Sequence, residues 1–116
     1  MPKWPEISDD PMYQLLRQDK IAEFNARREK GETAPLSGKN YRGLDLRDLN
    51  ADGLDFSDAY FRSADLRGID FRQCILTGAS LAEAKISGCF FPDNISPEEI
   101  RLSVEYGTRL RANTIT

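Results

Sequence analysis

The sequence predicts an all-β solenoid, a stack of short coils, with a short α-helical cap at each end. Three observations predict it: an apolar pattern of period five, turn-forming residues at one phase of that period, and helix-capping signals in both flanks. The 116 residues suffice for one compact domain. We expect an N-terminal helical cap over residues 1–33, the repeat over 34–93, and a C-terminal capping helix and tail over 94–116.

Apolar residues recur at two of the five positions of the repeat, which we call its phases. Every fifth residue from Leu36 is apolar, and so is the residue two positions before each of these, except Lys39. Both phases together are apolar at 23 of 24 positions, against 4 of 36 at the other three phases. A regular helix is excluded because residues five apart drift by about 140° around it. A flat strand is excluded because its faces alternate every two residues. The chain must therefore bend once in every pentad.

Turn formers occupy the phase where this bend is needed. Glycine and aspartate are favoured in turns because glycine adopts positive φ freely and aspartate bonds its own backbone. The residues at this phase include Gly38, Gly43, Gly53, Gly68, Gly78, Gly88, Asp48, Asp58 and Asp93.

Four pentads carry a resemblance to a known family. The segments 44–48 (LDLRD), 54–58 (LDFSD), 64–68 (ADLRG) and 79–83 (ASLAE) resemble the A-(D/N)-L-x-x unit of pentapeptide-repeat proteins, and the likeness extends over about half of the chain. It implies a right-handed quadrilateral β-helix with four pentads per coil and the central Leu or Phe inside. Twelve pentads then give about three coils, ~15 Å tall at the ~4.8 Å spacing of stacked strands.

Residues twenty apart should stack in such a coil. The four expected interior columns are Leu36, Phe56 and Leu76; Tyr41, Phe61 and Leu81; Leu46, Leu66 and Ile86; and Ala51, Phe71 and Phe91. Lys39 and Tyr41 depart from the pattern in the first coil, which predicts an entrance that is either covered or frayed.

The flank before the repeat contains signals for two helices. The open ends of a solenoid expose apolar side chains and unpaired backbone, so they need caps or partners. Asp10 before Pro11 predicts an N-cap with proline at the first helical position. The apolar phase breaks near Asp19, and a second helix is expected over residues 21–31, with Phe24 packed on the first coil.

The flank after the repeat contains one helix signal. Residues 96–99 (SPEE) form a capping box with proline at the first helical position, and Ile95 and Ile100 have the spacing of a hydrophobic staple. We expect a helix over residues 97–106, closed by a glycine, and a tail of weak strand character over 108–116.

Three apolar residues are candidate contacts for this cap or for a dimer: Phe90, Ile100 and Val104. Ile100 and Val104 share one face of the expected helix. Phe90 has an outward phase, so it is either covered by the helix and tail or part of a dimer contact, and coverage is the preferred interpretation.

The residues predict no enzyme, cofactor or metal site. There is no histidine, so proton transfer at neutral pH would need a perturbed carboxylate, Lys, Tyr or Cys. The glycines follow the five-residue period and form no phosphate-binding motif. Cys74 and Cys89 lie at interior phases without C-x-x-C spacing, so we expect reduced, buried thiols. Asp45 and Asp65 share an outer column, where each is expected to bond its own turn.

Outward arginines and one tyrosine form the candidate partner-binding surface: Arg42, Arg62, Arg47, Arg67, Arg72 and Tyr60. One interpretation is a basic strip for an acidic protein or a nucleic-acid backbone. The preferred one is a solvated face whose arginines pair with the neighbouring carboxylates of Asp45, Asp48, Asp52, Asp65 and Asp70. The repeat contains seven Lys or Arg and nine Asp or Glu residues, which argues against a nucleic-acid partner.

The expected function is a non-enzymatic protein-protein interaction or scaffold module with an unknown protein partner. The alternative comes from the resemblance, since some family members are DNA mimics that bind type II topoisomerases such as gyrase; a short coil stack with mixed charges argues against it. No window holds the roughly 18 consecutive apolar residues of a membrane span, and the start lacks the apolar core of a signal peptide. We therefore expect a cytoplasmic protein of bacterial type, without a membrane partner, and with a homodimer through its C-terminal end as a further expectation.

Overall fold

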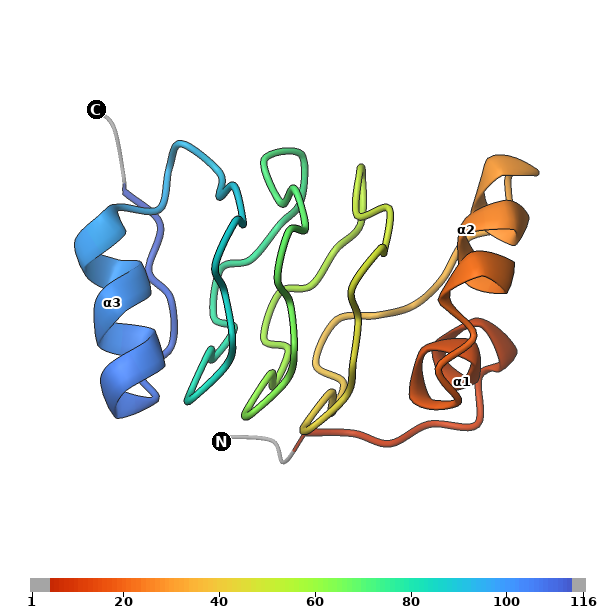
Figure 1. The fold of residues 1–116 in the computed structure, drawn as a ribbon, viewed down its shortest axis with the longest axis horizontal. Helices are drawn as coiled ribbons and strands as arrows, with labels where there is room; N and C mark the ends of the chain where they lie inside the picture. The colour runs from red at the N-terminus through yellow and green to blue at the C-terminus, as the bar shows by residue number, and fades with distance from the viewer. Residues whose placement is uncertain (1–4, 114–116) are drawn as a thin grey trace.

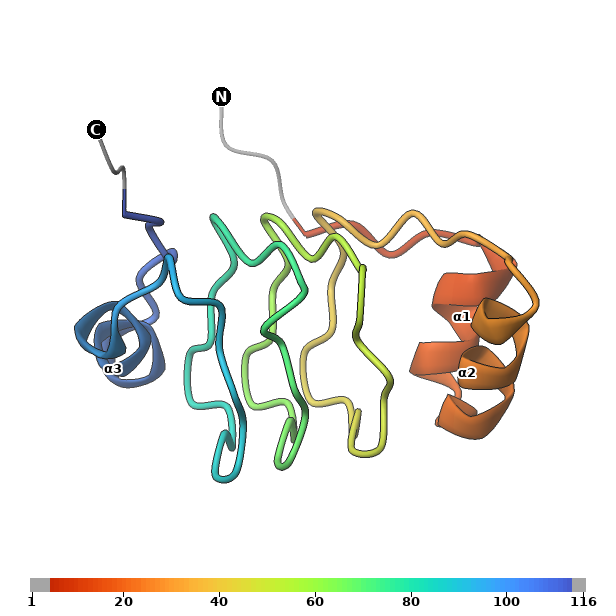
Figure 2. The same ribbon diagram turned by 90° about the horizontal axis from the view of Figure 1, so that it is seen from above.

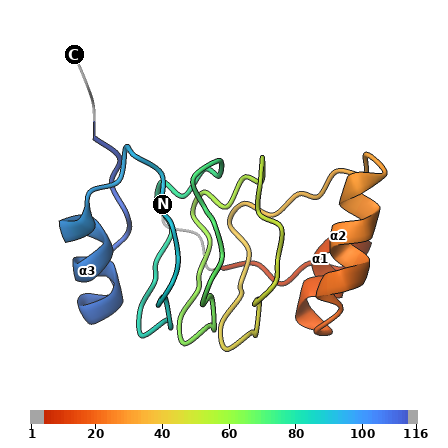
Figure 3. The same cartoon turned by 45° about the horizontal axis from the view of Figure 1, so that its top comes forward.

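Three α-helices are assigned in the computed structural model, which describes residues 5–113: α1 (Pro11–Arg17), α2 (Ile21–Glu29) and α3 (Pro97–Tyr106). Figure 1 shows α1 and α2 at one end of the repeat and α3 at the other, and Figure 3 shows the same arrangement from a second direction. No helix among the described residues has both the length and the apolar character needed to cross a bilayer.

Local capping explains where α1 and α3 begin. The Asp10 carboxylate accepts a hydrogen bond from the Tyr13 N–H, and the Ser96 hydroxyl accepts one from the Glu99 N–H, so each satisfies a free donor of the first turn. α3 ends at Tyr106, and the next residue, Gly107, closes the helix with a φ of 74°. Both predicted helix starts are confirmed.

α2 starts without a side-chain cap. Asp19, where a break was predicted, has a φ of 62° and separates α1 from α2. α2 ends at Glu29, two residues before the predicted Gly31, which has a φ of 93°. Phe24 is fully buried in the main core, as predicted.

The chain of the repeat turns once in every pentad. The Leu49 N–H donates to the Leu46 carbonyl at 3.1 Å, and the Ala64 N–H donates to the Phe61 carbonyl at 3.0 Å. A bond across four residues with positive φ at the third is typical of a type II turn. Ser63, with a φ of 58°, adopts this conformation as Asp48 does with 70°, although its side chain gave no such signal.

Residues twenty apart lie side by side on successive turns of the chain (Figure 2). Parallel bridges connect Tyr60 to Asn40 on one side and to Ser80 on the other. The Tyr41 N–H donates to the Tyr60 carbonyl at 2.8 Å, and the Tyr60 N–H donates to the Lys39 carbonyl at 3.0 Å. Twenty residues are four pentads, so each full circuit of the chain contains four bends. We call one such circuit a turn of the column.

The continuous strands of an all-β fold are not assigned anywhere in residues 5–113, where the β structure consists of isolated bridges. The chain bends in every pentad, so each straight stretch is too short for two consecutive bridges. The sequence therefore predicted correctly which residues pair across successive turns, but its prediction of regular β-strands is not confirmed.

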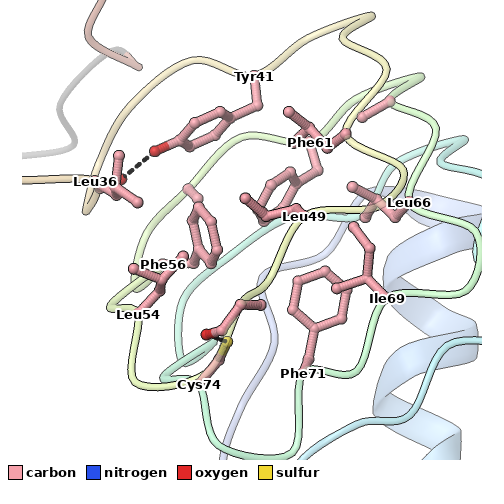
Figure 4. Packing of buried hydrophobic residues seen from close by; sticks show 14 of the residues in the cluster. Leu36, Tyr41, Leu49, Leu54, Phe56, Phe61, Leu66, Ile69, Phe71 and Cys74 are labelled. Carbon is pink, nitrogen blue, oxygen red and sulfur yellow. Dashed lines mark hydrogen bonds between the residues drawn. The ribbon is translucent and has the colours of Figure 1, made fainter. Parts of the chain in front are cut away.

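The predicted interior columns form the core. Ten of their twelve members are buried, and the two that are half-buried, Ile86 and Phe91, belong to the third turn. The aromatic members pack directly (Figure 4): the Tyr41 ring stacks on Phe61 with centroids 5.1 Å apart and meets Phe56 edge-on at 5.4 Å.

The first turn of the column is covered. Lys39, the polar exception at an interior phase, forms a parallel bridge and an ion pair with Glu6. The Tyr13 ring of α1 packs edge-on against Tyr41 with centroids 5.6 Å apart. Asn25 of α2 fixes the neighbouring corner through hydrogen bonds to the Asp48 carbonyl and the Asn50 N–H, each 2.9 Å. Of the two predicted alternatives, the covered entrance is confirmed.

The C-terminal tail pairs with the third turn of its own chain. Ser80 and Arg109 form an antiparallel bridge, and the Leu110 N–H donates to the Ala79 carbonyl at 2.8 Å. Leu110 is buried. The predicted capping box forms in one direction only, because the Glu99 carboxylate binds Arg111 of the tail at 2.7 Å instead of the Ser96 N–H.

Candidate functional site

A repeated hydrogen bond builds the outer wall of the column. In seven pentads the residue before the centre accepts, through its side-chain oxygen, a hydrogen bond from the N–H of the residue after the centre. Asp45 accepts from Arg47 at 3.1 Å, and Asp65 accepts from Arg67 at 3.3 Å. Where it forms, this bond fixes the start of the β-turn of its pentad. The prediction that Asp45 and Asp65 bond their own turns is confirmed.

Three of the predicted arginines each form an ion pair with the aspartate two residues earlier in the sequence. Arg67 donates through Nε to Asp65 Oδ1 at 2.9 Å and through Nη2 to Asp65 Oδ2 at 2.7 Å. Arg47 forms the same two bonds to Asp45, and its Nε also lies 3.4 Å from Asp65 Oδ2. The pKa of Asp65 is lowered to about 2, mainly by the side-chain hydrogen bonds from Arg67.

Arg72 completes this set on another wall of the column. Its guanidinium binds Asp70 at 2.8 Å and lies 4.6 Å from the centre of the Phe90 ring. The expected pairing with carboxylates is thus observed for Arg47, Arg67 and Arg72. It does not extend to Asp48 or Asp52, whose carboxylates form no ion pair within the described residues.

Arg42 and Arg62 differ from these three. They lie on adjacent turns, since the Gly43 N–H donates to the Arg62 carbonyl at 2.8 Å. The Arg42 side chain is exposed and has no ion-pair or hydrogen-bond partner within residues 5–113. Arg62 reaches Glu83 only at 3.7 Å, and interactions with Tyr60 and then Glu83 raise its pKa. We call Arg42, Arg62 and Tyr60 the Arg42 strip.

The residue two positions before each arginine accounts for this difference, and it can be read from the sequence. Arg47, Arg67 and Arg72 each follow an aspartate two residues earlier, whereas Arg42 follows Asn40 and Arg62 follows Tyr60. Asn40 accepts the Arg42 N–H at 2.9 Å as the aspartates do, but it carries no charge to hold a guanidinium.

The three predicted cap residues divide into two groups. Ile100 and Val104 of α3 are half-buried and pack against the core. Phe90 is 56% exposed, so the preferred prediction that the helix and tail cover it is wrong. The reason is their position: the tail pairs at residues 78–80, and the Val104 carbonyl of α3 accepts from the Glu83 N–H at 3.0 Å, both away from Phe90.

The two cysteines are free thiols at interior positions. Cys74 is buried, as predicted, with its Sγ 2.8 Å from the Ala51 carbonyl (Figure 4), and burial raises its pKa to about 12. Cys89 is only half-buried; burial raises its pKa as well, and its Sγ lies 2.9 Å from the Leu66 carbonyl.

An open hollow of about 470 Å³ lies where α2 meets the wall, lined by Asp19, Ile21, Ala22, Asp45, Arg47, Asp48 and Arg67. Its charged groups have opposite signs, and both arginines are held by the carboxylates described above. Within residues 5–113 no three His, Cys, Asp or Glu side chains are placed to hold a metal ion together.

Comparison with known proteins identifies the repeat. The sequence model of pentapeptide repeats matches residues 55–91 with 8 copies, inside the predicted repeat of residues 34–93. No curated protein and no solved structure matches the chain. Pentapeptide repeats generally form a β-helix, and the proteins that contain them are generally protein-interaction modules. Residues 55–91 are therefore pentapeptide repeats, and the twenty-residue register of the structure runs through this segment.

Proposed function

We propose that this protein is a non-enzymatic interaction module whose rigid wall binds an acidic protein through the Arg42 strip. One observation carries the proposal: Arg42 and Arg62 lie in register on adjacent turns, and neither is held by an aspartate of its own pentad. Arg42 has no ion-pair partner within residues 5–113 and Arg62 has only the looser pair with Glu83 at 3.7 Å, whereas Arg47, Arg67 and Arg72 are each bound by an aspartate.

The backbone of the column supports this function. Each turn is hydrogen-bonded to the next, so the backbone positions from which the two arginine side chains extend are held at a fixed spacing before a partner arrives, which lowers the entropy lost on binding. Guanidinium groups bind carboxylates in a bidentate geometry, so an acidic protein surface is the matching partner. Tyr60 adds a half-buried aromatic side chain beside them.

We infer in addition that the turns are the coils of a right-handed quadrilateral β-helix and that the protein acts in a cytoplasm of bacterial type. The twenty-residue register supports the first inference. The free thiols of Cys74 and Cys89 support a reducing compartment. A crystal structure tests the handedness, and cell fractionation tests the location.

The proposal is tested by affinity capture from native lysate with three forms of the protein. The first is the wild type and the second is Arg42→Glu with Arg62→Glu. The third is Lys20→Glu with Lys30→Glu, which changes two exposed cations outside the repeat and shifts the net charge by the same amount. We expect a partner bound by the wild type and by the lysine variant but lost by the arginine variant. Retention by all three forms would remove the Arg42 strip from the binding site.

DNA mimicry predicts a different result in a separate assay. It needs an acidic surface, but the carboxylates of Asp45, Asp65 and Asp70 are each occupied by an arginine. We expect the purified protein to leave supercoiling by gyrase unchanged. Inhibition of supercoiling, or protection of gyrase from an inhibitor, would favour the mimic over the module.

A further inference from the structure

Within residues 5–113, the third turn of the column is capped on one side only. On the capped side, the Gly78 N–H donates to the Leu110 carbonyl of the tail at 2.8 Å, and the Glu83 N–H donates to the Val104 carbonyl of α3 at 3.0 Å. Neither α3 nor the described tail forms a backbone hydrogen bond with residues 84–91. We call residues 84–91 the open edge.

The second turn shows which backbone groups the open edge leaves unpaired. Leu66, Gly68 and Phe71 donate their N–H groups to the third turn at 2.9, 3.0 and 2.7 Å. The carbonyls of Ala64 and Ile69 accept from it at 2.9 and 3.1 Å. The equivalent groups twenty residues later are the N–H groups of Ile86, Gly88 and Phe91 and the carbonyls of Ala84 and Cys89. None of these five groups has a hydrogen-bond partner within residues 5–113.

The apolar side chains of the open edge are also incompletely covered. Ile86, Cys89 and Phe91 are half-buried, whereas their counterparts one turn below are 0, 2 and 1% exposed. Phe90 on the outer side is 56% exposed. The open edge therefore combines a row of backbone groups that have no partner among the described residues with an apolar strip, which is the kind of surface to which an added strand binds.

We propose that the open edge binds an extended segment of a partner polypeptide, which adds one more rung to the column. This inference rests on the proposed function as an interaction module and names a second binding surface for it. The other half of the same turn already binds an extended segment, because the tail pairs there with Leu110 buried and with Arg109 and Arg111 directed outward.

The charge at the open edge indicates what the partner segment carries. Lys85 is exposed, forms no ion pair among the described residues, and is the last member of the outer column formed with Asp45 and Asp65. A partner side chain above Lys85 is therefore acidic, and the next one, directed inward onto Ile86 and Phe91, is apolar. The Asp-Leu and Asp-Phe steps of the chain's own pentads have this chemistry.

The test uses the full chain and a synthetic peptide with the sequence of residues 64–71 (ADLRGIDF), which is the segment that pairs with 84–91 from below. The chain is labelled with ¹⁵N and titrated with the peptide. We expect saturable shifts at the amides of Ile86, Gly88 and Phe91, with hydrogen exchange slowed there by about tenfold or more as the new bonds form. The amide of Gly78, which is bonded to the tail, should not change.

Two controls test the chemistry of the segment. A peptide with Leu66→Asp cannot bury its inward side chain and should not bind. A peptide with Asp65→Lys should bind poorly to the wild type but should regain affinity for a Lys85→Glu protein, whose changed side chain is exposed and leaves the core intact. Restored binding by this charge exchange would place the acidic residue above Lys85.

Three results would overturn the inference: no saturable change at the three amides, equal binding of the Leu66→Asp peptide, or a main change at Gly78, which would mean that the peptide displaces the tail.

Protection of the three amides that rises with protein concentration alone, without peptide, would assign the open edge to a second copy of this chain. The Arg42→Glu, Arg62→Glu protein should bind the peptide normally. Failure at the open edge is thus distinguishable from failure of the Arg42 strip.

Discussion

Gly78 shows how tightly a single position in the repeat is determined. It has a φ of +83°, and a Cβ at this position would overlap the Asp58 carboxylate, with Asp58 Cγ only 3.1 Å away. Gly68 has nearly the same φ of +80° but no atom within 4 Å of that Cβ position. The two glycines therefore share the conformational requirement and differ in the space around them.

We expect Gly68→Ala to cost about 1–2 kcal/mol of unfolding free energy, because a left-handed conformation strains any residue with a Cβ. Gly78→Ala should cost more than this, because it also displaces Asp58 and with it the contact to Arg109. Urea unfolding of both variants measures the difference. Equal losses would show that Asp58 yields without cost.

The two cysteines should react at different rates in the native protein. The thiolate is the reactive form, and burial raises the pKa of Cys74 to about 12 while Cys89 is less buried. We expect iodoacetamide to modify Cys89 before Cys74, and to modify both at similar rates in urea. Peptide mapping by mass spectrometry follows each site, and equal native rates would contradict the packing described for Cys74.

The sequence predicted individual residues well where the period decides their environment. The interior columns and the turn bonds of Asp45 and Asp65 follow directly from a phase of five. Ser63 and Glu83 lie at the phase of the turn glycines, but their residue types gave no signal for their φ of 58° and 57°, because neither side chain prefers positive φ.

At the level of elements, the tail stabilises the end of the column through Leu110. This side chain is 1% exposed, and its backbone bonds residues 78 and 79. We expect Leu110→Ala to reduce the unfolding free energy by about 2–5 kcal/mol, as is usual for a buried leucine. It should also accelerate hydrogen exchange at the Gly78 amide. Arg109→Ala, at an exposed neighbour, is the control, and an effect as large as that of Leu110→Ala would contradict this account.

The helices show which signals a sequence carries locally. Asp10-Pro11 and Ser96-Pro97 act within one turn of their helix, so the starts of α1 and α3 were predictable. The Glu99 carboxylate was assigned to its own helix because the spacing of a capping box is local. It binds Arg111 instead, twelve residues away, and no spacing rule anticipates that contact.

At the level of the whole molecule, the repeat determines which residues stack on successive turns, but it does not determine how the helices and the tail cover the two ends of the column. Spacing predicted the register of all three turns. Whether Phe90 is covered depends on which side of the third turn α3 and the tail meet, and this follows from contacts between segments far apart in the sequence. The Arg42 strip and the open edge arise where the repeated pairing is incomplete, so the regular pattern alone did not separate them from the rest of the wall.

The aspartates of the wall predict how the stability of the whole column depends on pH. Bonding to arginine lowers the pKa of Asp45, Asp65 and Asp70 below the ordinary value of 3.8, to about 2 for Asp65. At a pH between these values the unfolded chain binds more protons than the folded one, so stability is present above pH ~4 and is lost as the pH falls towards 2. Each wall of paired aspartates contributes to this loss.

Asp65→Asn separates the charge from the turn bond, because asparagine keeps the oxygen that accepts the Arg67 N–H, as Asn40 does for Arg42. We expect this variant to lose stability less steeply than the wild type between pH 4 and pH 2, measured by urea unfolding at a series of pH values. Asp9→Asn, at an exposed carboxylate outside the repeat, should leave the slope unchanged. Equal slopes for Asp65→Asn and the wild type would mean that the Asp65–Arg67 pair is broken in solution. Arg67 would then be as free to bind a partner as Arg42.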